Sequence, residues 1–344
     1  MLAEWEPQSA ILLTWPHPAS DWRPLLPQIE HSYLQLTALL SRTEDLWVLC
    51  HDAQHQAHVA HYLNAHAVAT DRIRFHLLPT NDTWIRDYGP ISVALPPASG
   101  ATHRRIAWVD FAFNAWGQDY PYALDRTLTA RLYAKLAHKP AACMQSDLVF
   151  EGGNLESNGA GLLLCNKDCL THNPALRDTS FTTVERTLKQ LLHIEQIAWI
   201  EQVQLAGDDT HGHIDNLARF CSTDTLVYTG CTQASHPNFQ ALKRLKHQLQ
   251  ALRERSRPAL RLIELPLPAD QYDAEGHLLP ASYANFLITN HQVIVPTFSA
   301  AQDQAALEIL QHCFPQRQVT GFDCRTLIQQ RGGIHCASLQ VHAD

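Results

Sequence analysis

The feature that most constrains the fold is a repeated order of elements along the chain. Five times, a segment with a helical pattern is followed by a strand-like run, and polar residues come next. Alternation of this kind predicts an α/β protein. The helical segments are 58–69, 128–137, 183–192, 239–252 and 304–314, and the strand-like runs are 72–78, 142–150, 194–200, 260–267 and 318–324.

The polar loops after these pairs recur at intervals of roughly 55 to 70 residues, a period typical of structural repeats. Their sequences are "NDTWIRDYGP", "EGGN", "GDDTHGHIDN", "PASYANF" and "RGGIHC". Further strand-like runs lie between the pairs, at 161–166, 224–230 and 285–298. The repeating unit is therefore about three strands and one helix.

In a closed radial array, every unit would present the same edge to the axis, so the five loops would converge on one central site. No Pro/Gly/Ser-rich linker divides the chain. The sequence therefore predicts one closed domain that spans residues 1–344.

Charge and cysteine content narrow the classes of partner. The formal net charge of −8 argues against nucleic acid and anionic membranes, and it fits a small cationic substrate. Nine cysteines without a C-x-x-C pair favour a reducing compartment, and we expect the cytoplasm. The first residues show no secretory pattern, and no apolar run approaches the roughly 20 residues of a membrane span.

The third and fifth loops supply a candidate catalytic pair. Cys336 follows two glycines, which allow the backbone to approach a ligand closely, and a cysteine thiolate is a strong nucleophile. His213 is the candidate acid/base, because imidazole titrates near neutral pH. Asp215 projects to the same side as His213 if this stretch is extended.

The first two loops supply carboxylates and an aromatic residue. Asp82 and Asp87 are candidates to hold a planar guanidinium by paired hydrogen bonds. Trp84 could pack against the substrate chain. Glu151 could orient an imidazole, or it could accept backbone N–H groups in a turn.

A metal site is the alternative for the third loop, because His211, His213 and Asp215 form an H-x-H-x-D spacing. Two-metal hydrolases with this box usually continue with histidine, where this chain has Asn216. The metal interpretation also leaves Asp87, Glu151 and Cys336 without roles. We therefore favour a site that needs neither a metal nor an organic cofactor.

Six motifs in order resemble the agmatine deiminases and their bacterial peptidylarginine deiminase relatives, in the guanidine-modifying (pentein) superfamily. They are "EWEPQSAILLTWP", "NDTWIRDYGP", "EGGN", "GDDTHGHIDNLARF", "PASYANF" and "GGIHC". The resemblance covers essentially the whole chain. It implies a five-bladed pseudo-symmetric α/β propeller, which agrees with the repeat.

The resemblance also implies a role for each site residue. Cys336 corresponds to the nucleophile and His213 to the general acid/base. Asp87 and Asp215 correspond to the pair that binds the guanidinium, and Glu151 to a supporting catalytic carboxylate. Two further substrate-binding positions follow from the resemblance, an aromatic one at Trp84 and an acidic one at Asp209.

Agmatine is the leading expected substrate, converted to N-carbamoylputrescine and ammonia in polyamine biosynthesis or arginine degradation. Peptidylarginine or free arginine is the alternative, and a non-catalytic guanidinium-binding protein is the alternative of a different class. Two departures from the family pattern concern the rim of the site. His211 stands where an acidic residue is usual, and Gly333 stands where asparagine is common. A homo-oligomer is compatible with the sequence.

Overall fold

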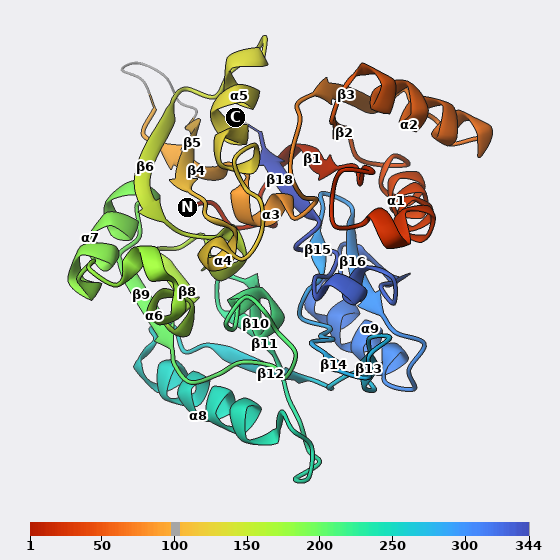
Figure 1. The fold of residues 1–344 in the computed structure, drawn as a ribbon. Helices are drawn as coiled ribbons and strands as arrows, with labels where there is room; N and C mark the ends of the chain where they lie inside the picture. Colours follow the sequence, from red (N-terminus) through yellow and green to blue (C-terminus); the bar gives the residue numbers. More distant parts are fainter. Residues whose placement is uncertain (98–103, 344) are drawn as a thin grey trace. The chain divides into compact units, whose positions relative to one another are not determined.

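The structure is a computed structural model that describes residues 1–97 and 104–343 (Figure 1). It divides into two compact units, each of mixed α/β structure. The expected single domain over residues 1–344 stays a prediction. Unit 1 comprises Met1–Trp5, Gly153–Ile288 and Gln292–His335, and unit 2 comprises Glu6–Gly152, Thr289–His291 and Cys336–Asp344.

Unit 2 contains two sheets, with strand orders β18-β1-β2-β3 and β4-β5-β6. In each sheet the first pair is antiparallel and the remaining neighbours are parallel. The strands are β1 (Gln8–Thr14), β2 (Leu46–Cys50), β3 (Ile73–Leu77), β4 (Ile91–Leu95), β5 (Arg105–Ala112), β6 (Cys143–Val149) and β18 (Ser338–His342).

Most helices of unit 2 lie in the crossovers that parallel strands require. Asp52 begins α2 by accepting a hydrogen bond from the backbone N–H of His55 at 2.8 Å. The helices are α1 (Leu26–Leu40), α2 (Ala53–Ala65), α3 (Ile85–Tyr88), α4 (Ala115–Gln118) and α5 (Leu128–Lys135), with short 3-10 helices at Arg23–Leu25 and Asp125–Thr127.

Unit 1 contains three three-stranded sheets and a short hairpin. The sheets are β7 (Glu156–Ser157), β8 (Leu162–Asn166) and β9 (Gln196–Ile200); β10 (Ala218–Ser222), β11 (Thr225–Thr229) and β12 (Arg261–Leu265); and β15 (Leu287–Ile288), β16 (Gln292–Thr297) and β17 (Gln318–Asp323). The hairpin pairs β13 (Gln271–Tyr272) with β14 (Leu278–Leu279).

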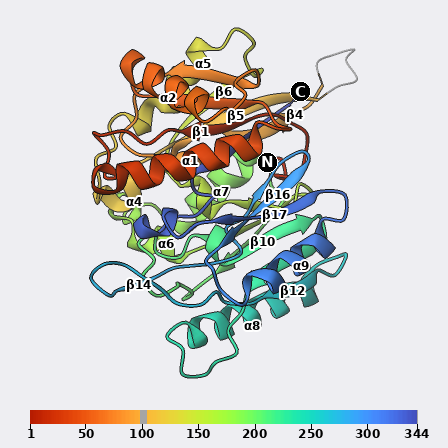
Figure 2. The ribbon, with the colours of Figure 1, turned by 90° about the vertical axis from the view of Figure 1, so that its right-hand side faces the viewer.

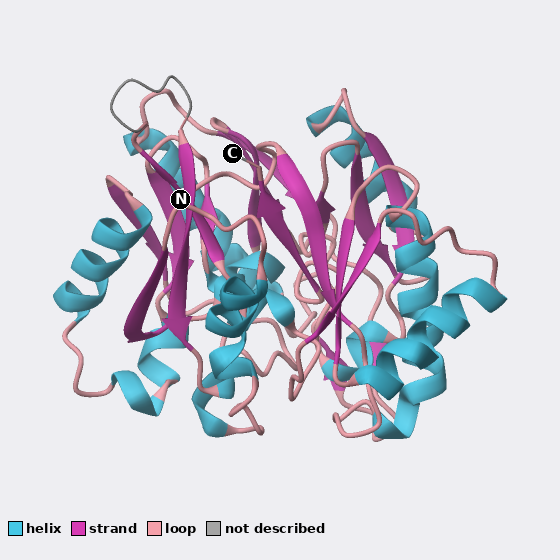
Figure 3. Cartoon of the chain, turned by 90° about the horizontal axis from the view of Figure 1, so that it is seen from above, coloured by secondary structure: helices cyan, strands magenta, loops and turns pink. Residues whose placement is uncertain are grey.

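The helices of unit 1 lie beside these sheets, and Figure 2 shows α8 next to β12 and α9 next to β17. They are α6 (Asp168–His172), α7 (Phe181–Leu192), α8 (Phe239–Arg255) and α9 (Asp303–Cys313), and 3-10 turns lie at Pro174–Leu176, Ile214–Asn216 and Leu327–Gln330. A further 3-10 turn, Gly152–Asn154, lies where the chain passes from one unit to the other. Figure 3 distinguishes the helices from the strands by colour.

The repeat of about three strands and one helix is confirmed in the three-stranded sheets. In each, an antiparallel pair is followed by a parallel pair whose crossover contains α5, α7, α8 or α9. The four-stranded sheet departs from this pattern, because both α1 and α2 cross over between its parallel strands. Its antiparallel edge strand comes from the end of the chain, as β18.

Helix α8 shows why these segments are helical. Its fully buried residues Leu242, Leu245, Leu249 and Leu252 recur at spacings of three and four, so they form one apolar face. That face packs into a core cluster with residues of β8, β10 and β11. Along the described chain, no helix is both long enough and apolar enough to span a bilayer.

The five polar motifs follow the last parallel strand of each sheet, namely β3, β6, β9, β12 and β17. Ligands commonly bind at the carboxyl ends of parallel strands. A motif that begins close to such a strand end, as "EGGN" does after β6, therefore lies at the kind of sheet edge where sites occur. "NDTWIRDYGP" lies in unit 2, "GDDTHGHIDN" and "PASYANF" lie in unit 1, and "EGGN" and "RGGIHC" each continue from one unit into the other.

Candidate functional site

In unit 2, helix α3 carries the two candidate residues of "NDTWIRDYGP". Trp84 occupies the position before the helix, is 5% exposed and packs against Trp22 with ring centroids 5.8 Å apart. Asp87 lies within the helix and is also 5% exposed. Asp82 has a role in the turn, because its Oδ1 accepts the backbone N–H of Thr83 at 2.6 Å.

The backbone of Arg86 brings the other candidates of unit 2 to α3. Its N–H donates to the carbonyl oxygen of Cys336 at 3.2 Å. Its own carbonyl oxygen would lie 2.1 Å from a Cβ added at Gly152, so only glycine fits there, directly after Glu151. Unit 2 therefore places Asp87, Glu151 and Cys336 on chain segments that meet at one residue.

The side chains of this group are buried. Glu151 is 5% exposed and Cys336 is 6% exposed. None of the nine cysteines, all of which lie in the described ranges, forms a disulfide. Asp87 accepts a hydrogen bond at Oδ2 from the indole N–H of Trp116 at 3.0 Å.

In unit 1, Asp208 organises the loop that carries His213. Its carboxylate accepts the backbone N–H groups of Thr210 at 2.9 Å and Gly212 at 2.7 Å. The Thr210 hydroxyl in turn accepts the N–H of His213 at 3.1 Å. Asp209, the acidic position that the family resemblance suggested, is half-buried in the same loop.

Gly212 is required for the path of this loop. Its φ of +94° lies in the left-handed region, and an added Cβ would come 2.5 Å from the carbonyl oxygen of Val203. Asn166 secures the turn by donating to the carbonyl oxygens of Gly212 and Val203, each at 2.7 Å. His213 is thereby fixed at 1% exposure.

Asp215 is held by a buried chain of ionisable groups. His335 lies between two carboxylates, with Nδ1 2.8 Å from Asp215 Oδ2 and Nε2 2.6 Å from Glu4 Oε1. Glu4 also pairs with Arg219, and Arg219 donates to Glu156 at 2.6 Å. All the side chains in this chain of contacts are largely buried.

Burial alone raises the pKa of the Asp215 carboxyl. The hydrogen bond and charge of His335, together with the charges of His213 and Arg219, outweigh burial and hold that pKa below its usual range. Asp215 is therefore maintained as an anion, which is the form that can bind a cation.

The "PASYANF" loop joins the segments of unit 1 through Asn285. Its amide donates to Asn216 Oδ1 at 3.0 Å, and its own Oδ1 accepts the backbone N–H of His335 at 3.0 Å. A Cβ at Gly333 would lie 2.4 Å from that Oδ1. The glycine that departs from the family pattern thus lies against Asn285.

The three residues of the H-x-H-x-D spacing contact different neighbours. The ring of His211 stacks on His172 at 4.6 Å, whereas Asp215 faces His335. Within the described ranges, one group of three potential ligands lies close enough to share an ion, and it is the exposed or half-buried set Asp273, Glu275 and His277. These three residues are remote in sequence from His211, His213 and Asp215.

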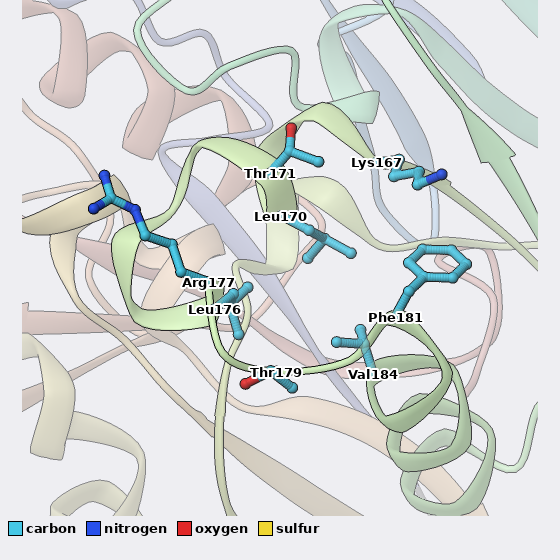
Figure 4. Close-up of a pocket in the computed structure, with 8 residues that line it drawn as sticks. All are labelled: Lys167, Leu170, Thr171, Leu176, Arg177, Thr179, Phe181 and Val184. Atoms are coloured by element: carbon cyan, nitrogen blue, oxygen red, sulfur yellow. The ribbon is translucent and has the colours of Figure 1, made fainter.

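Two cavities occur in unit 1. One, of about 340 Å³, has buried Leu170, Leu176 and Val184 among its walls (Figure 4). Lys167, which also lines it, is paired with Glu201. The other, of about 370 Å³, is lined in part by residues 230–233 and 266–270. Neither cavity is lined by a residue that the sequence analysis placed in the site.

Sequence reasoning missed four residues that support the site. Trp116 and His335 bond to the two carboxylates expected to bind the guanidinium, Asn285 joins two loops, and Asp208 shapes the loop of His213. Three of them lie inside motifs already recognised. Trp116 lies outside those motifs, in "FNAWG", where a tryptophan precedes a glycine.

Comparison with known proteins gives agreement over nearly the full chain. The family model "Porphyromonas-type peptidyl-arginine deiminase" matches residues 1–341. A putative agmatine deiminase of Marinomonas sp. (strain MWYL1) is 30% identical, covering 99% of this chain and 94% of that protein.

Two solved structures are similar over the same extent. The putative arginine deiminase from Porphyromonas gingivalis has a TM-score of 0.86 and 37% identity, covering 99% of this chain and 97% of its own. A cysteine-to-serine variant of C. jejuni agmatine deiminase with substrate bound has a TM-score of 0.87 and 28% identity, covering 99% and 96%.

Proposed function

Since the chain belongs to the Porphyromonas-type peptidyl-arginine deiminase family, we propose that it hydrolyses the guanidinium group of agmatine to N-carbamoylputrescine and ammonia. The observation that carries the proposal is the arrangement around Arg86. It places Cys336, which is in no disulfide, on a segment bonded to the helix of a buried carboxylate, Asp87. A cysteine nucleophile on a segment next to a carboxylate that can hold a cation suits attack on a guanidinium carbon.

Each candidate site residue has a distinct role in the proposed reaction. Asp87 and Asp215 accept N–H bonds from the guanidinium and keep it charged and oriented. Cys336 is the nucleophile, His213 is the general acid/base, and Glu151 supports the reacting groups. These roles require the groups of both units to act on one carbon atom, and that convergence stays a prediction.

The reaction proceeds in two stages. The Cys336 thiolate forms a bond to the guanidinium carbon, and ammonia departs with a proton from His213. His213 then removes a proton from water, which attacks the same carbon and breaks the carbon–sulfur bond. Water is consumed, ammonia and a ureido product are released, and the thiolate is regenerated.

Agmatine is proposed as the substrate on three grounds. The Marinomonas relative and the C. jejuni enzyme are both named as agmatine deiminases, and the net charge of −8 favours a cation. Asp209 supplies an additional acidic group in the loop of His213 for the distal amine. Arginine or peptidylarginine is the second candidate, because the family model and the P. gingivalis protein bear those names.

We also propose a domain architecture, a cellular compartment and a metabolic role for the protein. The five sheets with their repeated topology fit a single five-bladed propeller domain over residues 1–344. We expect the protein to act in the reducing cytoplasm, in polyamine biosynthesis or arginine degradation, without a metal or organic cofactor. A homo-oligomer would be compatible with this function.

The test compares ammonia release from agmatine, arginine and an arginine-containing peptide at equal concentrations. We expect the highest kcat/KM with agmatine, and activity that survives exhaustive chelation. Cys336→Ser should abolish turnover, and mass spectrometry of the quenched wild type should show an amidino adduct on Cys336. Binding of agmatine without ammonia release by the wild type would instead identify a guanidinium-binding protein.

A further inference from the structure

We propose that Trp116 is a positioning residue for Asp87, and that its indole N–H sets the carboxylate in the orientation that receives the guanidinium. The inference rests on the proposed function, since it takes Asp87 to be a guanidinium-binding group. It assigns a role to a residue that lies 29 positions from Asp87 and outside the recognised motifs.

The contact itself is a well-formed hydrogen bond. Trp116 Nε1 lies 3.0 Å from Asp87 Oδ2, within the normal range for N–H···O. Asp87 is 5% exposed, so water cannot easily replace this donor. One oxygen of the carboxylate is thereby fixed, and the plane of the carboxylate with it.

The backbone that presents Trp116 adopts an unfavourable conformation. Four consecutive residues have left-handed φ values: Ala115 (50°), Trp116 (55°), Gly117 (119°) and Gln118 (76°). Segment α4 is therefore a left-handed turn rather than a right-handed helix. Strained runs of this kind persist only where the surrounding structure imposes them, and they concentrate at functional sites.

Neighbouring groups impose this conformation. The side chain of Asn114 accepts the N–H of Gly117 at 3.2 Å, and its carbonyl oxygen accepts the N–H of Gln118 at 2.7 Å. The rings of Phe113 and Tyr120 meet the indole edge-to-face, with centroids 5.4 and 5.6 Å away. The turn and both rings thus hold the indole in the position from which it reaches Asp87.

The neutral indole N–H of Trp116 is a suitable hydrogen-bond donor to a carboxylate that binds a cation. An indole N–H donates but carries no charge, and it cannot titrate. Lysine or arginine at this position would neutralise the carboxylate and compete with a guanidinium substrate. Trp116 can therefore orient Asp87 while leaving its negative charge available for the substrate.

Trp108 provides a matched control in the same unit. It lies in β5 and is 1% exposed, and among residues 1–97 and 104–343 its buried indole N–H has no hydrogen-bond partner. Replacing Trp108 by phenylalanine removes part of an indole without removing a hydrogen bond. The comparison of Trp116→Phe with Trp108→Phe therefore separates the hydrogen bond from the loss of ring volume.

The experiment measures ammonia release from agmatine in both variants, together with alkylation of Cys336 by neutral iodoacetamide. For Trp116→Phe we expect at least a tenfold lower kcat/KM, mostly through a higher KM, and an unchanged alkylation rate. Protection of Cys336 from alkylation should require at least tenfold more agmatine. Trp108→Phe should stay within about threefold of the wild type in every measurement.

Three results would overturn the inference. They are a kcat/KM for Trp116→Phe within threefold of the wild type, equal losses in the two variants, and an alkylation rate that changes in parallel with turnover. The last would show general disruption of the unit. Failure of the proposed function gives a different pattern, because either the wild type itself would release no ammonia from agmatine or Cys336→Ser would keep its turnover, whatever the behaviour of Trp116→Phe.

Discussion

The two carboxylates assigned to the guanidinium, Asp215 in unit 1 and Asp87 in unit 2, are both buried but are supported by opposite means. Asp215 belongs to a chain of ionisable side chains that continues through His335 and Glu4 to Arg219. Asp87 is bonded to the neutral indole of Trp116, and the nearby backbone of Arg86 holds Cys336.

The difference predicts different sensitivities in the two units. A buried chain of charges leaves an uncompensated charge when one member is removed, so we expect large effects on stability. A neutral donor leaves a carboxylate less well oriented, so we expect an effect on substrate affinity with little change in stability.

Arg219→Met should cause the largest loss of stability. Arg219 is fully buried between Glu4 and Glu156, and its removal leaves two buried carboxylates without their cation. We expect the free energy of unfolding in urea to fall by about 3–5 kcal/mol. The control is Arg325→Met, which breaks an exposed pair with Asp323 and should cost no more than about 1 kcal/mol. Equal losses would contradict the contrast.

His335→Gln should affect both stability and catalysis. A glutamine amide can donate from one nitrogen only, so it cannot reproduce both contacts of His335, with Asp215 and with Glu4. We expect kcat/KM for agmatine to fall by about 10- to 100-fold, the loss typical of a hydrogen bond to a charged group. His291→Gln, which alters an exposed histidine beside Glu44, should keep wild-type activity. A stable, fully active His335→Gln would remove His335 from the site.

In unit 2, the contribution of Asp125 to stability should depend on pH. Burial raises the pKa of its carboxyl to about 8, with a further rise from the charge of Asp82, against bonds donated by the backbone N–H groups of Asn81 and Asp82. A pKa raised on folding gives stability that is complete below the unfolded value near 4 and is lost as pH rises through 8.

Asp125→Asn cannot ionise, so its stability relative to the wild type should improve as pH rises. We expect a relative gain of more than about 1.4 kcal/mol, the value of one pKa unit, between pH 5 and pH 9 in urea unfolding. Asp45→Asn, at an exposed pair with Arg72, should show no such trend. A flat difference for Asp125→Asn would show that this carboxyl is already ionised at pH 5.

The smallest expected effect concerns Asp209. It is half-buried beside Asp208, and its charge is expected to act on the distal amine of agmatine. Asp209→Asn should raise KM by less than about tenfold with kcat unchanged, and the effect should shrink at high salt because screening weakens exposed charges. Asp208→Asn should lower kcat, unlike Asp209→Asn, because Asp208 shapes the loop that carries His213.

Much of the fold was predictable from local pattern. All five helix–strand pairs are confirmed, and the differences lie at the ends of elements. Helix α7 begins at Phe181, two residues before the predicted start, because Ser180 caps it, and α8 extends three residues further, to Arg255. The strand predicted over residues 285–298 proved to be two, β15 and β16.

The reactive residues of the site could be predicted from the sequence, but the residues that hydrogen-bond to them could not. Asp87, Glu151 and Cys336 were identified by residue type in conspicuous loops, and the structure brings their segments together. Trp116 shows no such signal, since a tryptophan in a short polar stretch gives no indication of its hydrogen-bond acceptor. The left-handed backbone conformation from Ala115 to Gln118 could not be predicted either, because only one of these residues is glycine.

The sequence by itself determined the alternation of helices and strands, the order of the motifs and the identities of the reactive side chains. These properties depend on residue type and on spacing within a few positions. Only the tertiary structure decided that Trp116 bonds to Asp87 and that His335, 120 residues beyond Asp215, bonds to it. Such partners are selected when distant segments pack, because a buried carboxylate must find its donors among whatever groups the fold brings within about 3 Å.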